Sequence, residues 1–500
     1  MSDREPGTTE YDVIVLGGGP AGENAADYAI SGSDRTAIIV EPERVGGECS
    51  YWACVPSKAL LRPAHVLGAA HGLPGIETRG PDLAAVLRRR DEFVHLRDGD
   101  HDDSSQVAWA GGLGIEVIRG VGRLDGERRV TVGERVLHAR QAVVLATGTR
   151  AAIPDVPGLR EALPWTSRDA TSMHELPKRV VVIGGGVVAC EAATWLSSLG
   201  AEVTLLVRGD RLLAGTEPFA GKRVAQSLNA RGVRILFGTS PQRVQRPAAA
   251  DHGEGRVHGG PVTVHATGPD GESTLLADEL VVAAGRTPNT ADIGLETVGL
   301  RAGYVSVDDQ LTVTDVPGSW LYAVGDINHR AALTHMGKYQ GRVCGDVIAA
   351  RAEGRSLSAP RHRAGADHYA VPQVVFTDPE VAAVGLTEAA ARKAGYDVRT
   401  VALDIEVAGA ALTRDDYSGR AALVIDNTTD TVLGATFVGP EVGEQLHAAT
   451  IAVAGKVPLD ALWHAVPAFP TVSEFWLRLL ETDRSSLPSA DERNRTDHDH

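Results

Sequence analysis

Two cysteines near the start of the chain, Cys49 and Cys54, have a spacing that favours redox chemistry. The chain of 500 residues contains four cysteines, which is too few for a disulfide scaffold. In a reducing compartment, a closely spaced pair is more often redox-active or metal-binding than a structural staple. The other two, Cys190 and Cys344, lie in helical patterns, where we expect each to be a small buried hydrophobic residue.

A glycine-rich loop follows a buried-strand pattern at 13–16. In this Gly-x-Gly-x-x-Gly sequence, Gly17 permits a tight turn, Gly19 lets a pyrophosphate approach the backbone, and Gly22 lets the next helix pack on the strand. The N-terminus of that helix offers unpaired N–H groups to the phosphates. The following strand ends in Glu41, a carboxylate placed to accept both ribose hydroxyls. The combination predicts an FAD site rather than a purely structural glycine turn.

A second glycine loop follows another apolar strand and begins at Gly184. Gly186 is its second glycine, and Ala189 stands at the third position, which is an allowed variant. In an NAD site the next strand would end in an acid, but no acid stands there. Arg208 and Arg211 are instead placed to bind a 2′-phosphate, because the planar guanidinium suits phosphate. NADPH is therefore favoured over NADH; the alternative is that both arginines are simply solvated.

These features resemble the class I pyridine nucleotide-disulfide oxidoreductases, such as glutathione reductase, dihydrolipoamide dehydrogenase and mercuric reductase. The two cysteines with four residues between them, followed by Val-Pro-Ser-Lys, form the disulfide motif of that family. The resemblance extends from about residue 10 to residue 482. Further motifs that carry it lie at 146–148, 284–289, 312–326, 333–341 and 374–388.

The resemblance implies a role for each residue of the cysteine region. Cys54 would be the flavin-side thiol, forming a thiolate–flavin charge-transfer complex, and Cys49 the outer thiol that meets the substrate. Lys58 would lie near the flavin, pair with Glu191 and lower the pKa of Cys54. Asp326 would hold the ribityl chain of FAD. The further residues that it places around the two cofactors are Pro20, Ala21, Gly47, Glu48, Gly122, Thr147, Gly148, Gly285, Leu333, Thr334 and His335.

One position departs from the family near the C-terminus. The family's final motif is His-Pro-Thr-x-x-Glu, whose histidine reaches across a two-fold dimer and shuttles protons at the partner's outer thiol. Here Phe469 stands at the histidine position, and Glu474, its expected catalytic partner, is retained. Phenylalanine carries no proton, so a contribution of roughly 10²–10⁴-fold is missing from that position. His464 could replace it if the local backbone differs; the alternative is a surface or packed histidine.

The cysteine loop departs from the family as well. Tyr51 and Trp52 stand where the disulfide reductases usually carry smaller residues, and Glu48 replaces a common threonine. The two aromatic rings could form a flat apolar platform for a planar acceptor such as a quinone, or could be plain packing. The chain has no cysteine pair near its C-terminus, which argues against mercuric reduction.

The patterns predict an α/β fold with two doubly wound, Rossmann-like dinucleotide-binding domains and a C-terminal α+β dimerisation domain. We expect an FAD-binding domain formed by residues 10–155 and 284–360, which an NAD(P)-binding domain at 156–283 interrupts. Residues 361–482 would form the dimerisation domain. The polar ends, 1–9 and 483–500, are expected to be disordered.

Composition narrows the class of partner. The formal net charge of -16 argues against nucleic acid and anionic membranes, and no apolar run approaches the roughly 20 residues that span a bilayer. The start of the chain is polar and is not a secretory signal, so we expect a cytoplasmic homodimer without a metal centre. The leading hypothesis is an FAD-dependent NAD(P)H oxidoreductase that passes electrons through Cys49 and Cys54 to a disulfide or other small acceptor. The alternatives are a quinone reductase or diaphorase, in which electrons leave from the flavin, and a non-catalytic, redox-sensing subunit.

Overall fold

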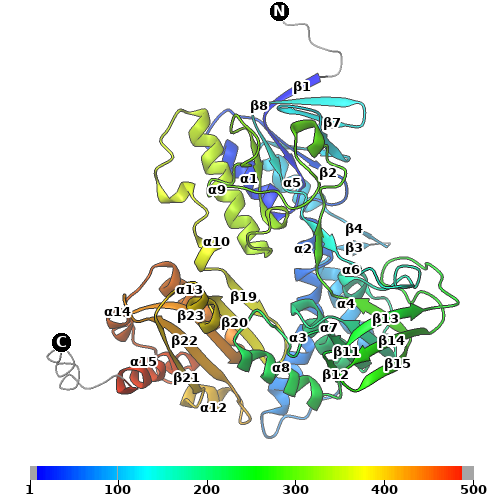
Figure 1. Cartoon of the computed structure of the whole chain (residues 1–500), viewed down its shortest axis with the longest axis vertical. Coiled ribbons are helices and arrows are strands. Elements are labelled where there is room, and N and C mark those ends of the chain that lie inside the picture. Colours follow the sequence, from blue (N-terminus) through cyan, green and yellow to red (C-terminus); the bar gives the residue numbers. More distant parts are fainter. Residues whose placement is uncertain (1–7, 98, 487–500) are drawn as a thin grey trace, which may run out of the picture.

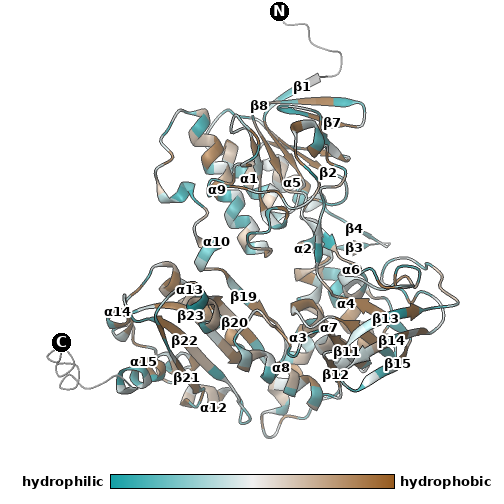
Figure 2. Cartoon of the chain, viewed as in Figure 1, coloured by the Kyte–Doolittle hydropathy of each residue, from teal (hydrophilic) through white to brown (hydrophobic). Residues whose placement is uncertain are grey.

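The computed structural model describes residues 8–97 and 99–486. Figure 1 shows three parts, one above and two side by side below, with the N-terminus at the top and the C-terminus at the lower left. Each part is built around its own β-sheet. Hydrophobic residues concentrate on the strands and on the helix faces that cover them, as Figure 2 shows. The mixed α/β architecture confirms the predicted fold class.

The upper part holds a seven-stranded sheet made of β1 (Thr8–Leu16), β2 (Ala37–Glu41), β5 (Ile115–Arg119), β6 (Gly122–Leu124), β7 (Arg129–Val132), β8 (Arg135–Leu145) and β18 (Leu321–Ala323). The order is β5-β2-β1-β8-β7-β6, with β18 also beside β8. β1 runs parallel to both β2 and β8, and its residues from Val13 to Leu16 are fully buried. An unbroken apolar run is what a strand enclosed on both faces requires.

Two long helices of the upper part, α1 (Pro20–Ile30) and α9 (Thr334–Ala352), lie against each other. They approach closely because Gly341 and Gly345 of α9 face the backbone of α1, where an added Cβ would collide with Ala21 and Ala29. This contact brings the first turns of both helices to the same edge of the sheet. The smaller elements here are α2 (Gly47–Tyr51), β3 (Leu96–Arg97), β4 (Asp100–His101), α5 (Ser104–Gly112), η1 (Leu295–Val298) and η2 (Gly325–Asn328).

The lower right part holds the second glycine loop. Its elements are α6 (Ser167–Ser172), β10 (Arg179–Ile183), α7 (Val187–Ser198), β11 (Glu202–Val207), α8 (Pro218–Ala230), β12 (Arg234–Phe237), β13 (Ser240–Gln245), β14 (Val262–Gly268), β15 (Gly271–Ala277) and β16 (Glu279–Val282). A parallel sheet runs in the order β12-β11-β10-β16, and β13, β14 and β15 form an antiparallel sheet. β9 (Thr149–Ala151) and β17 (Arg286–Pro288) pair where the chain enters and leaves this part.

The lower left part is an antiparallel sheet with helices packed on it. Its elements are η3 (Pro360–His362), α10 (Ala366–Tyr369), β19 (Pro372–Val375), β20 (Glu380–Gly385), α11 (Glu388–Lys393), β21 (Val398–Asp404), α12 (Ala408–Thr413), β22 (Arg420–Asp426), β23 (Thr431–Gly439), η4 (Val442–Gln445), α13 (Leu446–Ala454), α14 (Leu459–Trp463), η5 (Val472–Glu474) and α15 (Phe475–Ser486). The strand order is β19-β20-β23-β22-β21. Phe437 of β23 and Phe475 of α15 are both buried, and their rings meet edge to face with centroids 4.8 Å apart.

One segment does not follow the predicted division into domains. α3 (Cys54–His71) and α4 (Leu83–Phe93) fall inside 10–155, yet Leu60, Leu61 and Val86 belong to the apolar core that surrounds β10 and α7. Val375 of β19 joins the same core. The helix that carries Cys54 therefore touches all three parts, and sequence alone could not show this because all the partners of these leucines are distant in the chain.

The ordered chain is longer at both ends than predicted. β1 begins at Thr8, because pairing with β8 starts there. α15 continues to Ser486, and Asp483 is buried and accepts a hydrogen bond of 2.7 Å from Arg399 of β21, which anchors the last turn. The expectation of disorder at 1–9 and 483–500 is thus wrong for 8–9 and 483–486; the remainder lies outside the described residues. Within 8–97 and 99–486, no helix is long and apolar enough to cross a membrane.

Candidate active site

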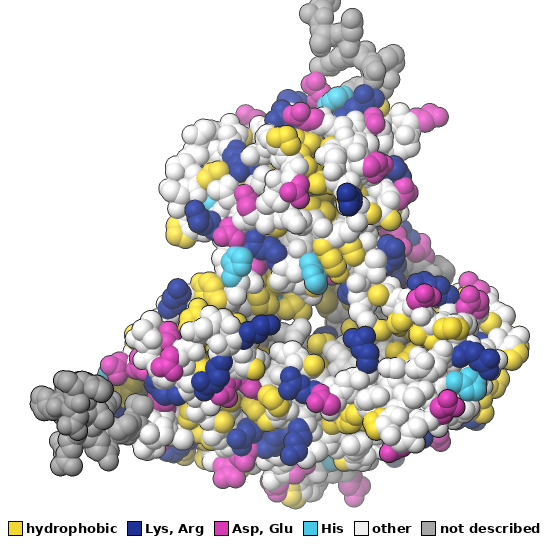
Figure 3. Space-filling model, in the orientation of Figure 1, with side chains coloured by type: hydrophobic (Ala, Val, Ile, Leu, Met, Phe, Trp, Pro, Cys, Tyr) yellow, Lys and Arg dark blue, Asp and Glu magenta, His cyan; other side chains and the backbone are white. Residues whose placement is uncertain are grey.

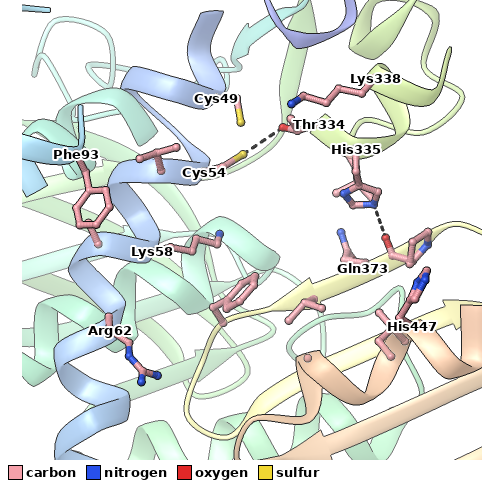
Figure 4. A pocket seen from close by; sticks show the side chains of 18 of the residues that line it. Cys49, Cys54, Lys58, Arg62, Phe93, Thr334, His335, Lys338, Gln373 and His447 are labelled. Carbon is pink, nitrogen blue, oxygen red and sulfur yellow. Dashed lines mark hydrogen bonds between the residues drawn. The ribbon is translucent and has the colours of Figure 1, made fainter. Parts of the chain in front are cut away.

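Cys49 and Cys54 come together at the junction of α2 and α3, and both are half-buried free thiols. The Sγ atom of Cys54 lies 3.2 Å from the hydroxyl oxygen of Thr334, the first residue of α9. Figure 4 shows both thiols directed toward this end of α9. The pair is therefore held between helices of two segments that are 280 residues apart.

The two thiols have very different acidities. The pKa of Cys54 is lowered to about 6, chiefly by a hydrogen bond with Cys49. Burial opposes this shift, and the Thr334 hydroxyl and the charge of Lys58 support it. The same hydrogen bond, together with burial, raises the pKa of Cys49 well above its usual range. Near neutral pH the reduced pair therefore carries one proton, on Cys49, and one negative charge, on Cys54.

Lys58 lies one turn beyond Cys54 and is ion-paired with Glu191 of α7. Its ammonium lies 2.9 Å from one carboxylate oxygen of Glu191 and 3.1 Å from the other, as the resemblance implies. The backbone N–H of Phe376 donates a hydrogen bond of 3.0 Å to the same carboxylate, and the Phe376 ring lies 4.8 Å from the ammonium. The cation is thus fixed beside the thiols by all three parts of the molecule.

The first glycine loop has the geometry of a dinucleotide site. Gly17 has a φ of 107°, and an added Cβ there would overlap the carbonyl oxygen of Ala146. Gly19 ends the loop as the N-cap of α1 and has no side-chain cap, so the first N–H groups of the helix remain available for a pyrophosphate. Glu41 is 8% exposed at the end of β2 and accepts a hydrogen bond of 2.6 Å from the Gly18 N–H. These features fit FAD, with Glu41 at the ribose.

The second glycine loop is also open where a pyrophosphate would lie. Gly184 has a φ of 143°, and an added Cβ at Gly186 would meet nothing within 4 Å. Ala189, at the third position of the motif, is fully buried. Arg208 is exposed at the end of β11, whereas Arg211 is half-buried and donates a hydrogen bond of 2.9 Å to the Ala214 carbonyl. Arg208 is therefore the freer of the two to meet a phosphate.

The other residues that the resemblance placed near the cofactors surround the same edge of the upper sheet. Asp326 accepts a hydrogen bond of 2.8 Å from Thr149. The carboxylate of Glu48 accepts hydrogen bonds from two arginines, one of 3.0 Å from Arg286 and one of 3.4 Å from Arg168. Glu48 therefore makes ion pairs at a position where the family commonly has a threonine. The positions of the remaining residues are as follows: Pro20 and Ala21 in α1, Gly47 in α2, Gly122 in β6, Thr147, Gly148 and Gly285 in the links around β9 and β17, and Leu333, Thr334 and His335 at the start of α9.

The C-terminal segment does not reach the cysteines of its own chain. Phe469 is 76% exposed and does not line the cavity beside them. Glu474 is buried, with one carboxylate oxygen accepting a hydrogen bond of 2.7 Å from Arg478. His464 is exposed at the end of α14. Within one chain, the raised pKa of Cys49 arises from its hydrogen bond with Cys54 and from burial.

The aromatic platform for a planar acceptor is not present. Tyr51 is 2% exposed and Trp52 7%, and their rings meet edge to face with centroids 5.6 Å apart. The Tyr51 hydroxyl donates to the Val45 carbonyl, and the Trp52 ring nitrogen donates to Glu254. Neither side chain lines the cavity, so the packing interpretation is the correct one.

A cavity of about 920 Å³ opens beside the thiols. Its walls come from α2, α3, α4, α9, β19 and α13, and Figure 4 shows side chains from these elements converging on it. Most of its lining residues were given no role from the sequence. Some of them, such as Val55, Lys338 and Phe376, lie within family motifs, and the others lie outside any motif. The residues without an assigned role are Val55, Ala59, Arg62, Arg89, Phe93, Lys338, Pro372, Gln373, Val374, Phe376, Gly443, Leu446, His447 and Thr450.

Two dinucleotide loops on either side of a dithiol and its paired lysine define a class: a nicotinamide-dependent flavin oxidoreductase with a redox cysteine pair. Comparisons with known proteins agree. The family described as pyridine nucleotide-disulphide oxidoreductase matches residues 11–341, and its dimerisation domain matches 371–479. The chain belongs to this family, whose members are enzymes that use FAD and a pyridine nucleotide.

Relatives with different substrates are about equally similar. A dihydrolipoyl dehydrogenase of Chlamydia muridarum (strain MoPn / Nigg) is 31% identical over 479 residues, covering 93% of this chain and 95% of that protein. A mercuric reductase of Staphylococcus aureus is 29% identical over 473 residues, covering 93% and 81%. The Cu(II) complex of the HOCl-induced flavoprotein disulfide reductase RclA from Escherichia coli has the same fold, with a TM-score of 0.78, 22% identity and coverage of 95% and 99%.

Proposed function

We propose that this protein is a homodimeric, NADPH-preferring reductase that passes two electrons through Cys49 and Cys54 to a small-molecule acceptor. The observation that carries the proposal is the cysteine pair itself, with Lys58 held beside it by Glu191. A subunit that kept its flavin only for structure would not need one thiol with a pKa of about 6 and another with a raised pKa.

The electrons and protons balance as follows. NADPH gives up a hydride, which is two electrons and one proton, and bound FAD would supply the two-electron carrier between the nicotinamide and the cysteines. The two electrons and the proton of the hydride convert the Cys49–Cys54 disulfide into a thiol on Cys49 and a thiolate on Cys54, which lies beside Lys58. A disulfide acceptor takes up the two electrons, the proton of Cys49 and one proton from water, and leaves as two thiols, and the Cys49–Cys54 bond forms again.

The homodimer is supported by the surface of the C-terminal part. Ile451, Val466 and Phe469 are 56%, 80% and 76% exposed. Exposed apolar side chains of this size mark a contact surface, and they lie within the segment that matches the family's dimerisation domain. A C₂ dimer would bring such a patch against its own copy.

An anaerobic NADPH titration followed by visible absorbance tests the proposal. Two-electron reduction should give a long-wavelength band from the Cys54 thiolate beside oxidised flavin, appearing as the pH rises through about 6. Cys54→Ser should abolish the band, whereas Cys49→Ser should keep it. Direct bleaching of the flavin in the wild type, without the band, would show that the cysteines are not in electronic contact with it.

Phe469 favours a second candidate, reduction of quinones or dyes in place of disulfides. A disulfide acceptor needs a proton for its leaving thiol, and Phe469 cannot supply one at the histidine position. We expect slow turnover with glutathione disulfide and lipoamide and appreciable turnover with quinones. Phe469→His, next to the retained Glu474, should raise disulfide turnover at least tenfold, because a positioned base is worth roughly 10²–10⁴. Fast wild-type turnover with these disulfides would instead identify another base, and His464→Ala would be the next variant to measure.

A further inference from the structure

The cavity beside the thiols carries a charge opposite to that of the whole chain. The chain has a formal net charge of -16, yet the lining residues include four cations, Lys58, Arg62, Arg89 and Lys338, and no aspartate or glutamate. Figure 3 shows basic and histidine side chains gathered around the hollow between the upper and lower parts. A cationic cavity in an acidic protein focuses anions toward it.

Two of these cations are already neutralised. Lys58 is paired with Glu191 at 2.9 Å, and Arg62 lies 3.8 Å from Glu441. Neither is available in full to a ligand that enters the cavity. The positive charge that remains in the cavity comes from Arg89 and Lys338.

Arg89 has no carboxylate partner among the described residues. Its guanidinium donates one hydrogen bond of 3.2 Å to the Ala59 carbonyl and lies 4.6 Å from the centroid of the Phe93 ring. Both Arg89 and Phe93 are exposed on α4 and both line the cavity. They therefore present a charge and an apolar face side by side.

Lys338 lies at the other side of the cysteine pair and is the fifth residue of α9. Figure 4 shows its ammonium directed toward Thr334 and the two thiols. No ion pair of Lys338 is present among the described residues. Its charge acts to lower the pKa of two groups, Glu23 of α1 and Cys49. No carboxylate of the described residues therefore lies within ion-pair distance to offset it.

Much of the remaining wall is apolar, with Phe93, Val374, Phe376 and Leu446 among the lining residues. The other polar side chains that line it include no acid; they are Thr334, His335, Gln373, His447 and Thr450. A ligand that satisfies both kinds of surface has an apolar body and at least one anionic group.

We infer that the physiological electron acceptor is an anion with an apolar body, bound through Arg89 and Lys338. The inference rests on the proposed function and narrows its substrate class. A quinone acceptor of this kind takes two electrons from the reduced cysteine pair and two protons and leaves as a hydroquinone; a disulfide leaves as two thiols. The anionic group does not react and serves only to hold the acceptor.

Matched acceptors that differ in charge test the inference. Naphthoquinone sulfonate is compared with the parent naphthoquinone, and dithiobis(nitrobenzoate) with the neutral dithiodipyridine, by steady-state kinetics on the FAD-loaded dimer. The double variant Arg89→Met, Lys338→Met should raise KM for the anionic member of each pair at least tenfold and for the neutral member less than twofold. Added salt should raise KM for the anions alone. Arg88→Met is the control, because Arg88 is exposed on the same helix and does not line the cavity.

Three outcomes would overturn the inference. One is an equal change for charged and neutral acceptors, and another is slower flavin reduction by NADPH in Lys338→Met, which would assign that cation to the flavin. The third is a failure of naphthalene sulfonate, which cannot be reduced, to bind the oxidised wild-type enzyme more tightly than the double variant. If instead NADPH produced no long-wavelength band in the wild type, the proposed function would fail, and the binding measurement would still decide the anion preference.

Discussion

The two glycine loops of this chain share a backbone turn, and three of the equivalent positions at which their side chains differ bear on packing or on the ligand. Gly17 and Gly184 both have positive φ values, 107° and 143°, and an added Cβ at either would overlap the carbonyl oxygen of a neighbouring strand. Beyond that shared turn, the third glycine is Gly22 in one loop and Ala189 in the other. The next residue is Glu23 in the first loop and Cys190 in the second. At the end of the following strand stands Glu41 in the first case and Arg208 in the second.

The backbone turn and the bound nucleotide place different requirements on the residues of these loops. Only the first glycine of each loop is fixed by backbone conformation, since Gly19 and Gly186 have room around them. We expect the acid that follows one strand and the base that follows the other to set the choice of nucleotide. The third position (Gly22 or Ala189) and the residue after it, the fourth position (Glu23 or Cys190), lie where each helix packs on its strand. Substitutions there should have the largest effects on stability.

The largest effect is expected at the third position. An added Cβ at Gly22 would overlap the backbone carbonyl oxygen of Gly17, which cannot move away as a side chain could. Gly22→Ala should therefore cost more than about 3 kcal/mol and abolish flavin retention. Ala189→Gly should cost about 1 kcal/mol, the usual cost of glycine inside a helix. Flavin content and thermal unfolding of the two variants, measured side by side, check this.

Two other results for Gly22→Ala and Ala189→Gly would contradict this explanation. If Gly22→Ala kept its flavin and unfolded at the wild-type temperature, the two loops would tolerate the same residue, and the difference between them would have no packing origin. A large loss in Ala189→Gly would indicate that the alanine methyl group contributes to the core around α7.

The next largest effect concerns the fourth position. Glu23 is 7% exposed, one of its carboxylate oxygens has no hydrogen-bond partner among the described residues, and burial raises its pKa to about 7. Lys338 of α9 lowers this pKa and Glu41 of β2 raises it. A shift from 4.5 to about 7 corresponds to about 3 kcal/mol. Because the folded state holds the proton more tightly, wild-type stability falls as the pH rises from about 4.5 to 7.

Glu23→Gln keeps the shape of the neutral acid, so its advantage over the wild type should grow across that range to about 3 kcal/mol and stay constant above it. Denaturant unfolding at a series of pH values measures the difference. Cys190→Ala is the matched control, because burial raises the pKa of this thiol and leaves it neutral throughout. A difference between Glu23→Gln and wild type that did not change with pH would show that Glu23 is charged when folded.

Local sequence was sufficient for the parts of the fold that depend on local chemistry. The two glycine loops, the buried strand at 13–16 and the burial of Cys190 and Cys344 follow from residue type and spacing, and the structure confirms them. The ion pair of Lys58 with Glu191 came from the family resemblance, since the two residues are 133 positions apart. Arg89 lies in no motif, and the motif at 333–341 contains Lys338 without giving it a role, because the cavity forms only where elements distant in the chain surround the cysteines. For Tyr51 and Trp52 the sequence left a ligand platform and plain packing both open, and in the structure both side chains are buried, which indicates packing.

The smallest expected effect lies at the strand end and concerns the choice of nucleotide. Arg208 is exposed where β11 ends, at the carboxyl edge of a parallel sheet where dinucleotides bind. Replacing Arg208 and Arg211 with methionine should raise KM for NADPH about tenfold, or roughly 1.4 kcal/mol, because a charge-assisted contact with the 2′-phosphate is lost. KM for NADH, which lacks that phosphate, should change less than twofold. Arg234→Met is the control, since Arg234 begins β12 at the opposite edge of the same sheet. Equal changes for NADPH and NADH would show that the arginines do not bind the 2′-phosphate, and a loss confined to Arg211→Met would assign the effect to its hydrogen bond with the Ala214 carbonyl and to the shape of the loop.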